Sequence, residues 1–222
     1  MKFEIKGVRK QYGKRMPLSD GNFTVESGEC VGILGRNGSG KSTLLSILAG
    51  VQKADSGTFF AEECDLFRNR EQLCRLVGYV PQGTPLIEEL SARDNLLLWC
   101  EQKTCDRELE NGVLKMLGIG EFIGLPVRKM SGGMKKRLSI GCSVVKKPKL
   151  LLLDEPCAAL DLIAKAHIRE YIAEFKRAGG AAVLTTHDGD EIALCDRLYI
   201  LNDGVLVPYQ YDGDIAGLAQ LL

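Results

Sequence analysis

The chain has 222 residues, and its 29 lysines and arginines balance its 29 aspartates and glutamates, so the formal net charge is zero. Apolar residues make up 45% of the chain and charged residues 26%, which is ordinary for a globular protein and excludes a mainly disordered chain. A protein that holds nucleic acid by bulk positive charge would show a basic excess, so no nucleic-acid partner is expected.

The sequence shows no membrane span and no secretion signal. Its longest apolar runs are a handful of residues, whereas a spanning helix needs about 20. Charged and apolar residues alternate at the N-terminus, which lacks the apolar core of a signal peptide. We therefore expect a cytosolic protein that reaches a membrane only through a partner.

Eight cysteines raise the question of disulfides or a zinc site. No two of them are separated by two residues, the spacing typical of paired metal ligands. In a reducing compartment free thiols are the expected state.

Strand-like and helix-like segments alternate along the chain. A half-buried strand is predicted around Phe3 and Ile5, and apolar runs predict strands at 29–34, 77–80, 149–153 and 181–186. Helices are predicted at 41–49, 134–145 and 162–178, and Asn202-Asp203-Gly204 predicts a hairpin turn. This alternation indicates an α/β fold with a mostly parallel sheet, and the helical stretch that begins near residue 85 indicates an inserted subdomain.

A glycine-rich loop joins the second predicted strand to the first helix. Its sequence, Gly35-Arg36-Asn37-Gly38-Ser39-Gly40-Lys41-Ser42, fits the phosphate-loop pattern in full. Glycines let backbone N–H groups converge on phosphate oxygens, and the start of the helix presents its positive dipole end to the same anion. Lys41 is expected to reach the terminal phosphates, and the Ser42 hydroxyl is expected to bind Mg²⁺.

Two carboxylates, Asp154 and Glu155, follow a buried run of four leucines. Ligands of open α/β sheets bind at the carboxyl ends of strands, where this pair is predicted to lie. Asp154 is then placed to hold Mg²⁺, and Glu155 to act as general base toward the attacking water.

Further motifs follow in a recognisable order. Tyr12 precedes the phosphate loop, Gln82 follows a predicted strand, and Ser131-Gly132-Gly133 opens a helix. Ala159-Leu160-Asp161 comes next, and His187 follows another predicted strand. With the phosphate loop and the acidic pair, these residues resemble the ATPase subunits of ABC transporters, over nearly the whole chain.

The resemblance implies a fold, ligands and residue roles. It implies a P-loop NTPase core with a mostly parallel sheet, an antiparallel β subdomain, and a helical subdomain at about 85–145 inserted in one domain spanning 1–222. ATP and Mg²⁺ are the implied ligands. The implied catalytic residues are Lys41, Gln82, Glu155 and His187; the nucleotide-binding residues are Tyr12, residues 35–43 (ending in Thr43) and 131–133; the metal-binding residues are Ser42, Gln82 and Asp154.

The resemblance also implies partners. Two subunits would pack head to tail, so that Ser131-Gly132-Gly133 of each closes over the ATP of the other. Membrane permease subunits would receive the motion near residues 82–98, at the cytoplasmic face of the membrane. The neighbourhood of Met130 to Leu138 is most similar to ATPases of the exporter type, so export is the expected direction.

Some residues depart from the family pattern, and alternatives stay open. Met134 replaces the usual glutamine of the signature loop, and Met130 replaces the leucine, while Cys157 and Ala158 precede the segment 159–161. The basic run 135–137 is expected to be a solvated face, and His167 an exposed helix position. The alternatives are a soluble ATPase, such as one for iron–sulfur assembly, and a degenerate nucleotide-binding scaffold, against which Glu155 and His187 argue.

Overall fold

The computed structural model describes residues 1–211 and 213; the predicted domain runs on to 222, and residues 212 and 214–222 lie outside the described part. The described residues form a ten-stranded sheet in the order β5-β4-β1-β2-β10-β9-β3-β8-β7-β6. The strands are β1 (Lys2–Tyr12), β2 (Arg15–Glu26), β3 (Cys30–Leu34), β4 (Ser56–Ala61), β5 (Cys64–Asp65), β6 (Val77–Val80), β7 (Leu150–Asp154), β8 (Ala181–Thr185), β9 (Arg197–Asn202) and β10 (Val205–Tyr209). The α-helices are α1 (Lys41–Leu48), α2 (Arg70–Leu76), α3 (Ala92–Leu97), α4 (Gln102–Asn111), α5 (Val113–Met116), α6 (Gly132–Val144), α7 (Leu162–Arg177) and α8 (Gly189–Ile192), with short 3-10 turns at Ile119–Phe122 and Val127–Lys129.

The sheet has a parallel and an antiparallel part. Strands β6, β7, β8, β3 and β9 pair in parallel, whereas β1 pairs antiparallel with both β2 and β4. The predicted hairpin is confirmed, since β9 and β10 pair antiparallel around residues 202–205. The expected α/β fold with a mostly parallel core sheet and an antiparallel β part is confirmed.

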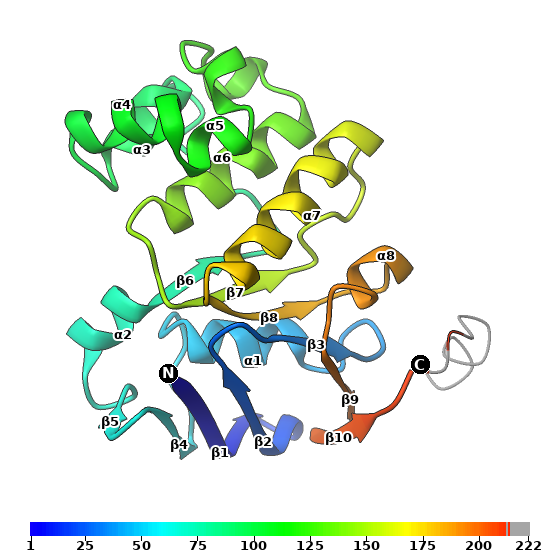
Figure 1. Ribbon diagram of the computed structural model, residues 1–222. Coiled ribbons are helices and arrows are strands. Elements are labelled where there is room, and N and C mark those ends of the chain that lie inside the picture. The colour runs from blue at the N-terminus through cyan, green and yellow to red at the C-terminus, as the bar shows by residue number, and fades with distance from the viewer. Residues whose placement is uncertain (212, 214–222) are drawn as a thin grey trace.

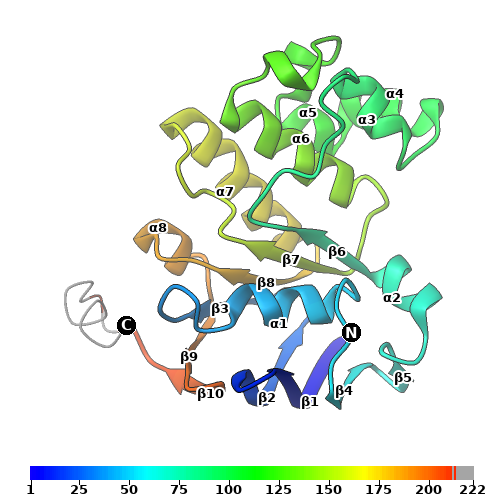
Figure 2. The ribbon, with the colours of Figure 1, turned by 180° about the vertical axis from the view of Figure 1, so that it is seen from behind.

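Strand β7 shows how the sheet divides two cores. Its leucines alternate, so that Leu150 and Leu152 join the cluster around α1, while Leu151 and Leu153 join the cluster around α7. Figures 1 and 2 show α1 and α7 on opposite faces of the sheet. Because both faces are covered, the strand is a continuous apolar run, as expected for the interior of a parallel sheet.

Helices α3 to α6 form a separate group on the same side of the sheet as α7, beyond the β6 edge (Figure 1). Their buried side chains, including Leu96, Leu114 and Leu138, belong to the same cluster as Leu151 and Leu153. Although helices α3 to α6 form their own group, their buried side chains and those of α7 belong to one apolar core, and this shared packing holds the group against α7.

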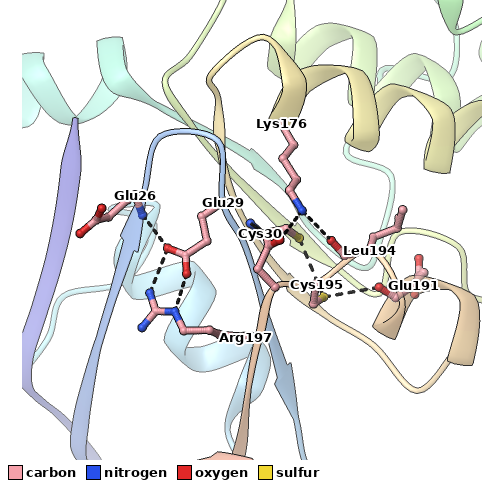
Figure 3. A network of polar contacts seen from close by, with 9 residues as sticks. Glu26, Glu29, Cys30, Lys176, Glu191, Leu194, Cys195 and Arg197 are labelled. Carbon is pink, nitrogen blue, oxygen red and sulfur yellow. Dashed lines mark hydrogen bonds and ion pairs between the residues drawn. The ribbon is translucent and has the colours of Figure 1, made fainter. Parts of the chain in front are cut away.

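A polar network ties the start of β3 and the residue before it to the start of β9 and the residues before that strand (Figure 3). The Arg197 guanidinium pairs with both oxygens of Glu29, with Nη2 at 2.9 Å from Oε2. The Asp196 carboxylate accepts from the Cys30 amide at 2.8 Å, and the Asp196 amide donates back to the Cys30 carbonyl at 2.8 Å. The Cys30 thiol donates a hydrogen bond to the Cys195 sulfur at 3.9 Å with no disulfide between them, and all eight cysteines, which lie in the described part, are free thiols as expected.

Two exposures differ from the sequence-based expectation. The basic run is not a solvated face, because Lys136 is 4% exposed and Arg137 is 7% exposed. Arg137 donates to the Leu117 carbonyl at 3.1 Å, and its guanidinium lies over the Phe122 ring. His167 is half-buried rather than exposed, since its Nδ1 lies 3.0 Å from the Met116 carbonyl. Both expectations were wrong because these side chains contact segments distant in the sequence, which periodicity within one helix does not reveal.

No helix within residues 1–211 and 213 is both long and apolar enough to span a bilayer.

Candidate active site

The phosphate loop connects the end of β3 to the first residue of α1. Gly40, the residue before the helix, has φ +116°, a backbone conformation that side chains rarely allow. A Cβ at this position would lie 2.6 Å from the Pro17 carbonyl oxygen. The loop can therefore pass this close to β2 only with glycine at position 40.

Lys41, the first residue of α1, is buried beneath the loop and is 5% exposed. Its ammonium donates to the carbonyls of Gly35 and, at 3.1 Å, Arg36, and lies 3.2 Å from Nε2 of His187. Burial lowers the pKa of Lys41, and the carboxylates of Glu155 and Asp154 oppose that shift. The cation thus lies between the loop carbonyls and the acidic end of β7.

Glu155 contacts two of the other predicted site residues. The Gln82 amide nitrogen donates to Glu155 Oε2 at 2.9 Å, and His187 Nε2 lies 3.8 Å from Glu155 Oε1. Burial, followed by the positive charge of Lys41, lowers the pKa of His187, whereas Glu155 raises it less. His187 is therefore neutral near pH 7, and its contact with Glu155 is not an ion pair.

Asp154 is 2% exposed and is held by Thr185 of the neighbouring strand β8. The Thr185 hydroxyl donates to Asp154 Oδ1 at 2.7 Å, and the Thr185 hydroxyl oxygen accepts from the Glu155 amide at 3.1 Å. The chain turns sharply at Glu155, whose φ is +47°. One threonine therefore fixes both members of the acidic pair, a role that the sequence reasoning missed although Thr185 lies within a predicted strand.

A cavity of about 400 Å³ opens over the phosphate loop. It is lined by Tyr12, Arg15, Pro17, Asn37, Gly38, Gly40, Lys41, Ser42, Thr43, Gln82 and Glu155. Nine of these eleven residues were predicted from the sequence, and the volume is in the range of small-molecule sites. Asp154 and His187 do not line this cavity, but His187 contacts two residues that do, Lys41 and Glu155.

Arg15 and Pro17 were not predicted as site residues. Arg15 follows the turn after Tyr12, and its guanidinium donates to the Gly38 carbonyl of the phosphate loop. The signal available in the sequence was a positive charge, Arg15, three residues after the predicted adenine-binding Tyr12. Tyr12 itself is 47% exposed, and its hydroxyl donates to Gln52, so the ring is held open to solvent.

The predicted signature loop lies apart from this cavity within one chain. Ser131 caps α6, accepting from the Met134 amide at 3.2 Å, and both Ser131 and Gly132 are exposed. Gly133 is buried against α7, where an added Cβ would lie 2.8 Å from Ala164 Cβ. The structure therefore does not bring residues 131–133 to the phosphate loop of the same chain.

The loop that carries His187 is anchored to α7 by ion pairs. The Asp188 carboxylate accepts from Lys165 and from Arg169, each at 2.9 Å. Thr186 donates to the buried carboxylate of Glu191, and its oxygen accepts from the Asp188 amide at 2.9 Å. His187 is thus held between two anchored neighbours.

The hydrogen-bond donors and oxygen ligands at this site suit a nucleoside triphosphate and a hard cation such as Mg²⁺. Ser39 Oγ is buried, and among residues 1–211 and 213 it has no hydrogen-bond partner, so the loop contains an unused polar atom. In the same described part, no three His, Cys, Asp or Glu side chains gather into a metal cage. The nearby oxygen donors of Ser42, Gln82 and Asp154 are of the type that Mg²⁺ prefers, together with phosphate oxygens.

Comparisons with known proteins agree with this geometry. The family described as "ABC transporter" matches residues 18–158. The chain is 33% identical over 212 residues to the lantibiotic transport ATP-binding protein SrtF of Streptococcus pyogenes, covering 95% of this chain and 91% of that protein. It is 31% identical over 211 residues to the linearmycin resistance ATP-binding protein LnrL of Bacillus subtilis, covering 92% and 67%. It is 37% identical to the Nod factor export ATP-binding protein I of Sinorhizobium fredii, covering 90% of this chain and only 60% of that protein.

Solved structures show the same architecture. An ATP-binding subunit of an ABC transporter superposes with a TM-score of 0.85 at 26% identity, covering 99% of this chain and 94% of the other. The dimeric structure of the bacterial ABC transporter cassette MJ0796 gives 0.84 at 27% identity, covering 96% and 100%. With the phosphate loop, the acidic pair and these likenesses together, the chain belongs to the ABC transporter family as one of its ATP-binding, ATP-hydrolysing cassettes.

Proposed function

We propose that the chain powers export through separate membrane permease subunits, with Glu155 as the general base of ATP hydrolysis. The observation that carries the proposal is the meeting of Lys41, Gln82, Glu155 and His187 around the phosphate loop, within contacts of 2.9–3.8 Å. These residues come from four separate segments of the chain, and a scaffold without catalysis would not need them together.

Nucleotide binding uses the loop and the residues around it. Residues 35–43 supply backbone amides and the start of α1 to the phosphates, and Tyr12 offers its exposed ring face to the adenine. Lys41 exchanges the carbonyls of Gly35 and Arg36 for phosphate oxygens when ATP binds, because a charged acceptor forms the stronger bond. Arg15, beside Gly38, adds a second positive charge to the cavity wall.

Hydrolysis follows from the contacts of Glu155. Its carboxylate takes a proton from a water that is aligned with the terminal phosphate, while the Gln82 amide holds the carboxylate in place. His187, neutral because of its lowered pKa, contacts both the phosphate and Glu155 without competing as an acid. Lys41 stabilises the negative charge that develops on the transferring group.

We propose Mg²⁺ as the accompanying ion, held by Ser42, Gln82 and Asp154. The ion would neutralise charge on the phosphate oxygens. The role of the chain is to supply the three oxygen donors, with Asp154 fixed by Thr185.

The working unit is proposed to be a head-to-tail dimer at the cytoplasmic face of a membrane. The relatives include proteins named for lantibiotic transport and Nod factor export, and one similar cassette is dimeric. Because Ser131 and Gly132 are exposed and apart from the chain's own cavity, they are available to the ATP of a second subunit. The segment at about 85–145 acts as the helical subdomain of the single cassette and presents residues 82–98 to the permease.

Glu155→Gln tests the general base. The amide retains the size of the side chain but cannot take a proton, so turnover should fall at least 100-fold while ATP still binds, and ATP-bound dimers should accumulate on a sizing column. Glu170→Gln, an exposed position on α7, is the matched control and should keep full activity. Turnover of Glu155→Gln equal to that of the parent would remove Glu155 as base.

Ser131→Asp tests the shared site. Aspartate caps a helix as well as serine does, so α6 remains stable, but its charge opposes the triphosphate of a partner. Each subunit should bind ATP with unchanged affinity, and turnover should be lost. Normal turnover would refute the head-to-tail arrangement.

A further inference from the structure

Lys136 is a buried cation on the helix that begins at the signature loop. It is 4% exposed, although it stands in the basic run 135–137. Its ammonium donates to the carbonyl of Pro81 at 2.7 Å and to the carbonyl of Gln82 at 3.1 Å. These two residues directly follow β6, more than 50 positions earlier in the chain, so the contact joins two separate parts of the site.

The surroundings of this ammonium include the catalytic end of β7. Burial lowers the pKa of Lys136, and the opposing charges that raise it begin with Asp154 and include Glu155. A buried cation is costly, and an apolar side chain of similar length would fill the same space at less cost. The position therefore has a use beyond packing α6 against β6.

The adjacent residue provides a contrast. Lys135 is partly exposed, and its ammonium lies 3.0 Å from the exposed carboxylate of Glu88. A surface pair of this kind contributes little to stability. Of two consecutive lysines, one is thus directed outward and the other toward the backbone that carries Gln82.

We propose that Lys136 is a positioning residue for Gln82: by holding the carbonyls of Pro81 and Gln82, it directs the Gln82 side chain to Glu155. The inference rests on the proposed roles of Gln82 and Glu155 and adds the connection between them and α6. Lys136 follows Ser131 by five residues, so a shift of the signature loop is carried along about one and a half turns of α6 to the Gln82 backbone.

The first experiment compares Lys136→Met with Lys135→Met in the full chain. Lys136→Met removes both hydrogen bonds while keeping length and apolar volume, so kcat for ATP should fall at least tenfold with the KM for ATP within twofold. Lys136→Arg, which keeps charge and donors, should recover most of the activity. Lys135→Met should behave as the parent. Parental kcat in Lys136→Met would overturn the inference.

The second experiment combines Lys136→Met with Gln82→Ala. If Lys136 acts through Gln82, the double variant turns over ATP no more slowly than Gln82→Ala alone. A loss that equals the product of the two single losses would show that Lys136 acts elsewhere and would overturn the inference. Parental activity of Gln82→Ala would instead refute the role of Gln82 in the proposed function, which separates the two failures.

Should Lys136→Met not fold, Lys136→Gln takes its place in both experiments. Its amide donates to a single carbonyl without charge, so a threefold or larger loss of kcat at unchanged KM is expected. Unchanged kcat in that variant would equally overturn the inference.

Discussion

Gly132 and Gly133 are neighbours at the start of α6, yet an added methyl group meets different surroundings at the two positions. At Gly133 the Cβ would lie 2.8 Å from Ala164 Cβ and 3.2 Å from Asp161 Oδ2, so α6 and α7 must move apart. At Gly132 nothing in the described part of the chain lies within 4 Å of the added atom. The pair therefore separates packing within one chain from contact with a partner.

The expected changes in unfolding free energy follow from these distances. Overpacking costs about 1–3 kcal/mol, and alanine in a helix returns about 1 kcal/mol, so Gly133→Ala should lose about 0–2 kcal/mol. Gly132→Ala should gain about 0.4–1 kcal/mol, because alanine restricts the unfolded chain without a clash. Urea denaturation of the full chain measures both, and equal stabilities would refute the packing of Gly133 on α7.

Although Gly132→Ala should be more stable than the parent, its ATP turnover should be lower. In the proposed dimer its backbone lies against the phosphate of the partner's ATP, where a methyl group meets an overpacking cost of about 1–3 kcal/mol. Since about 1.4 kcal/mol is tenfold in rate, Gly132→Ala should lose about 5- to 140-fold in turnover despite its greater stability. Parental turnover would show that no phosphate approaches this loop.

Three further outcomes are expected. Leu152→Ala, in the buried strand β7, should lower the free energy of unfolding by about 2–5 kcal/mol, while Leu162→Ala, 83% exposed, should change it by less than about 0.5 kcal/mol in urea denaturation. The lowered pKa of His187 means that the unfolded chain binds its proton more readily, so stability should fall as pH drops below about 6.5, and His187→Asn should reduce that fall in denaturation measured from pH 7 to 5. In the native protein a thiol reagent should label Cys74 fastest, because it is the exposed cysteine, whereas Cys157 should react only on unfolding, since burial raises its pKa; rapid native labelling of Cys157 would contradict the packing.

The parallel core of the fold was predictable because its strands are continuous apolar runs. Leu150–Leu153 and 181–185 need no knowledge of the partner strand to be identified, since both faces of the sheet are covered. Strands β2, β4 and β5 escaped this pattern, because β2 contains Pro17 and mixes polar with apolar residues, and β5 has only two residues. Their identification depends on pairing with β1, which is a long-range property.

The site was predictable to the extent that its residues follow motifs with a mechanism. The loop 35–42 and the acidic pair are of this kind, and most residues that line the cavity were found in this way. Arg15, Thr185 and Lys136 were not, because each acts through a backbone or carboxylate contact that only the folded chain creates. Nothing in the basic run 135–137 indicates that Lys136 donates to the carbonyls of Pro81 and Gln82, which are distant in the sequence.

Helix α7 touches two of the segments proposed to handle nucleotide. Near its N-terminus Ala164 packs on Gly133, while the adjacent Lys165, and Arg169 about one turn beyond it, bind the carboxylate of Asp188 beside His187. All three attachments lie in the N-terminal half of this 16-residue helix, so they move together as one rigid part. A second subunit that displaces Gly133 would thus also tilt the imidazole of His187. Contact at the subunit boundary would in this way change the position of a catalytic side chain through one helix.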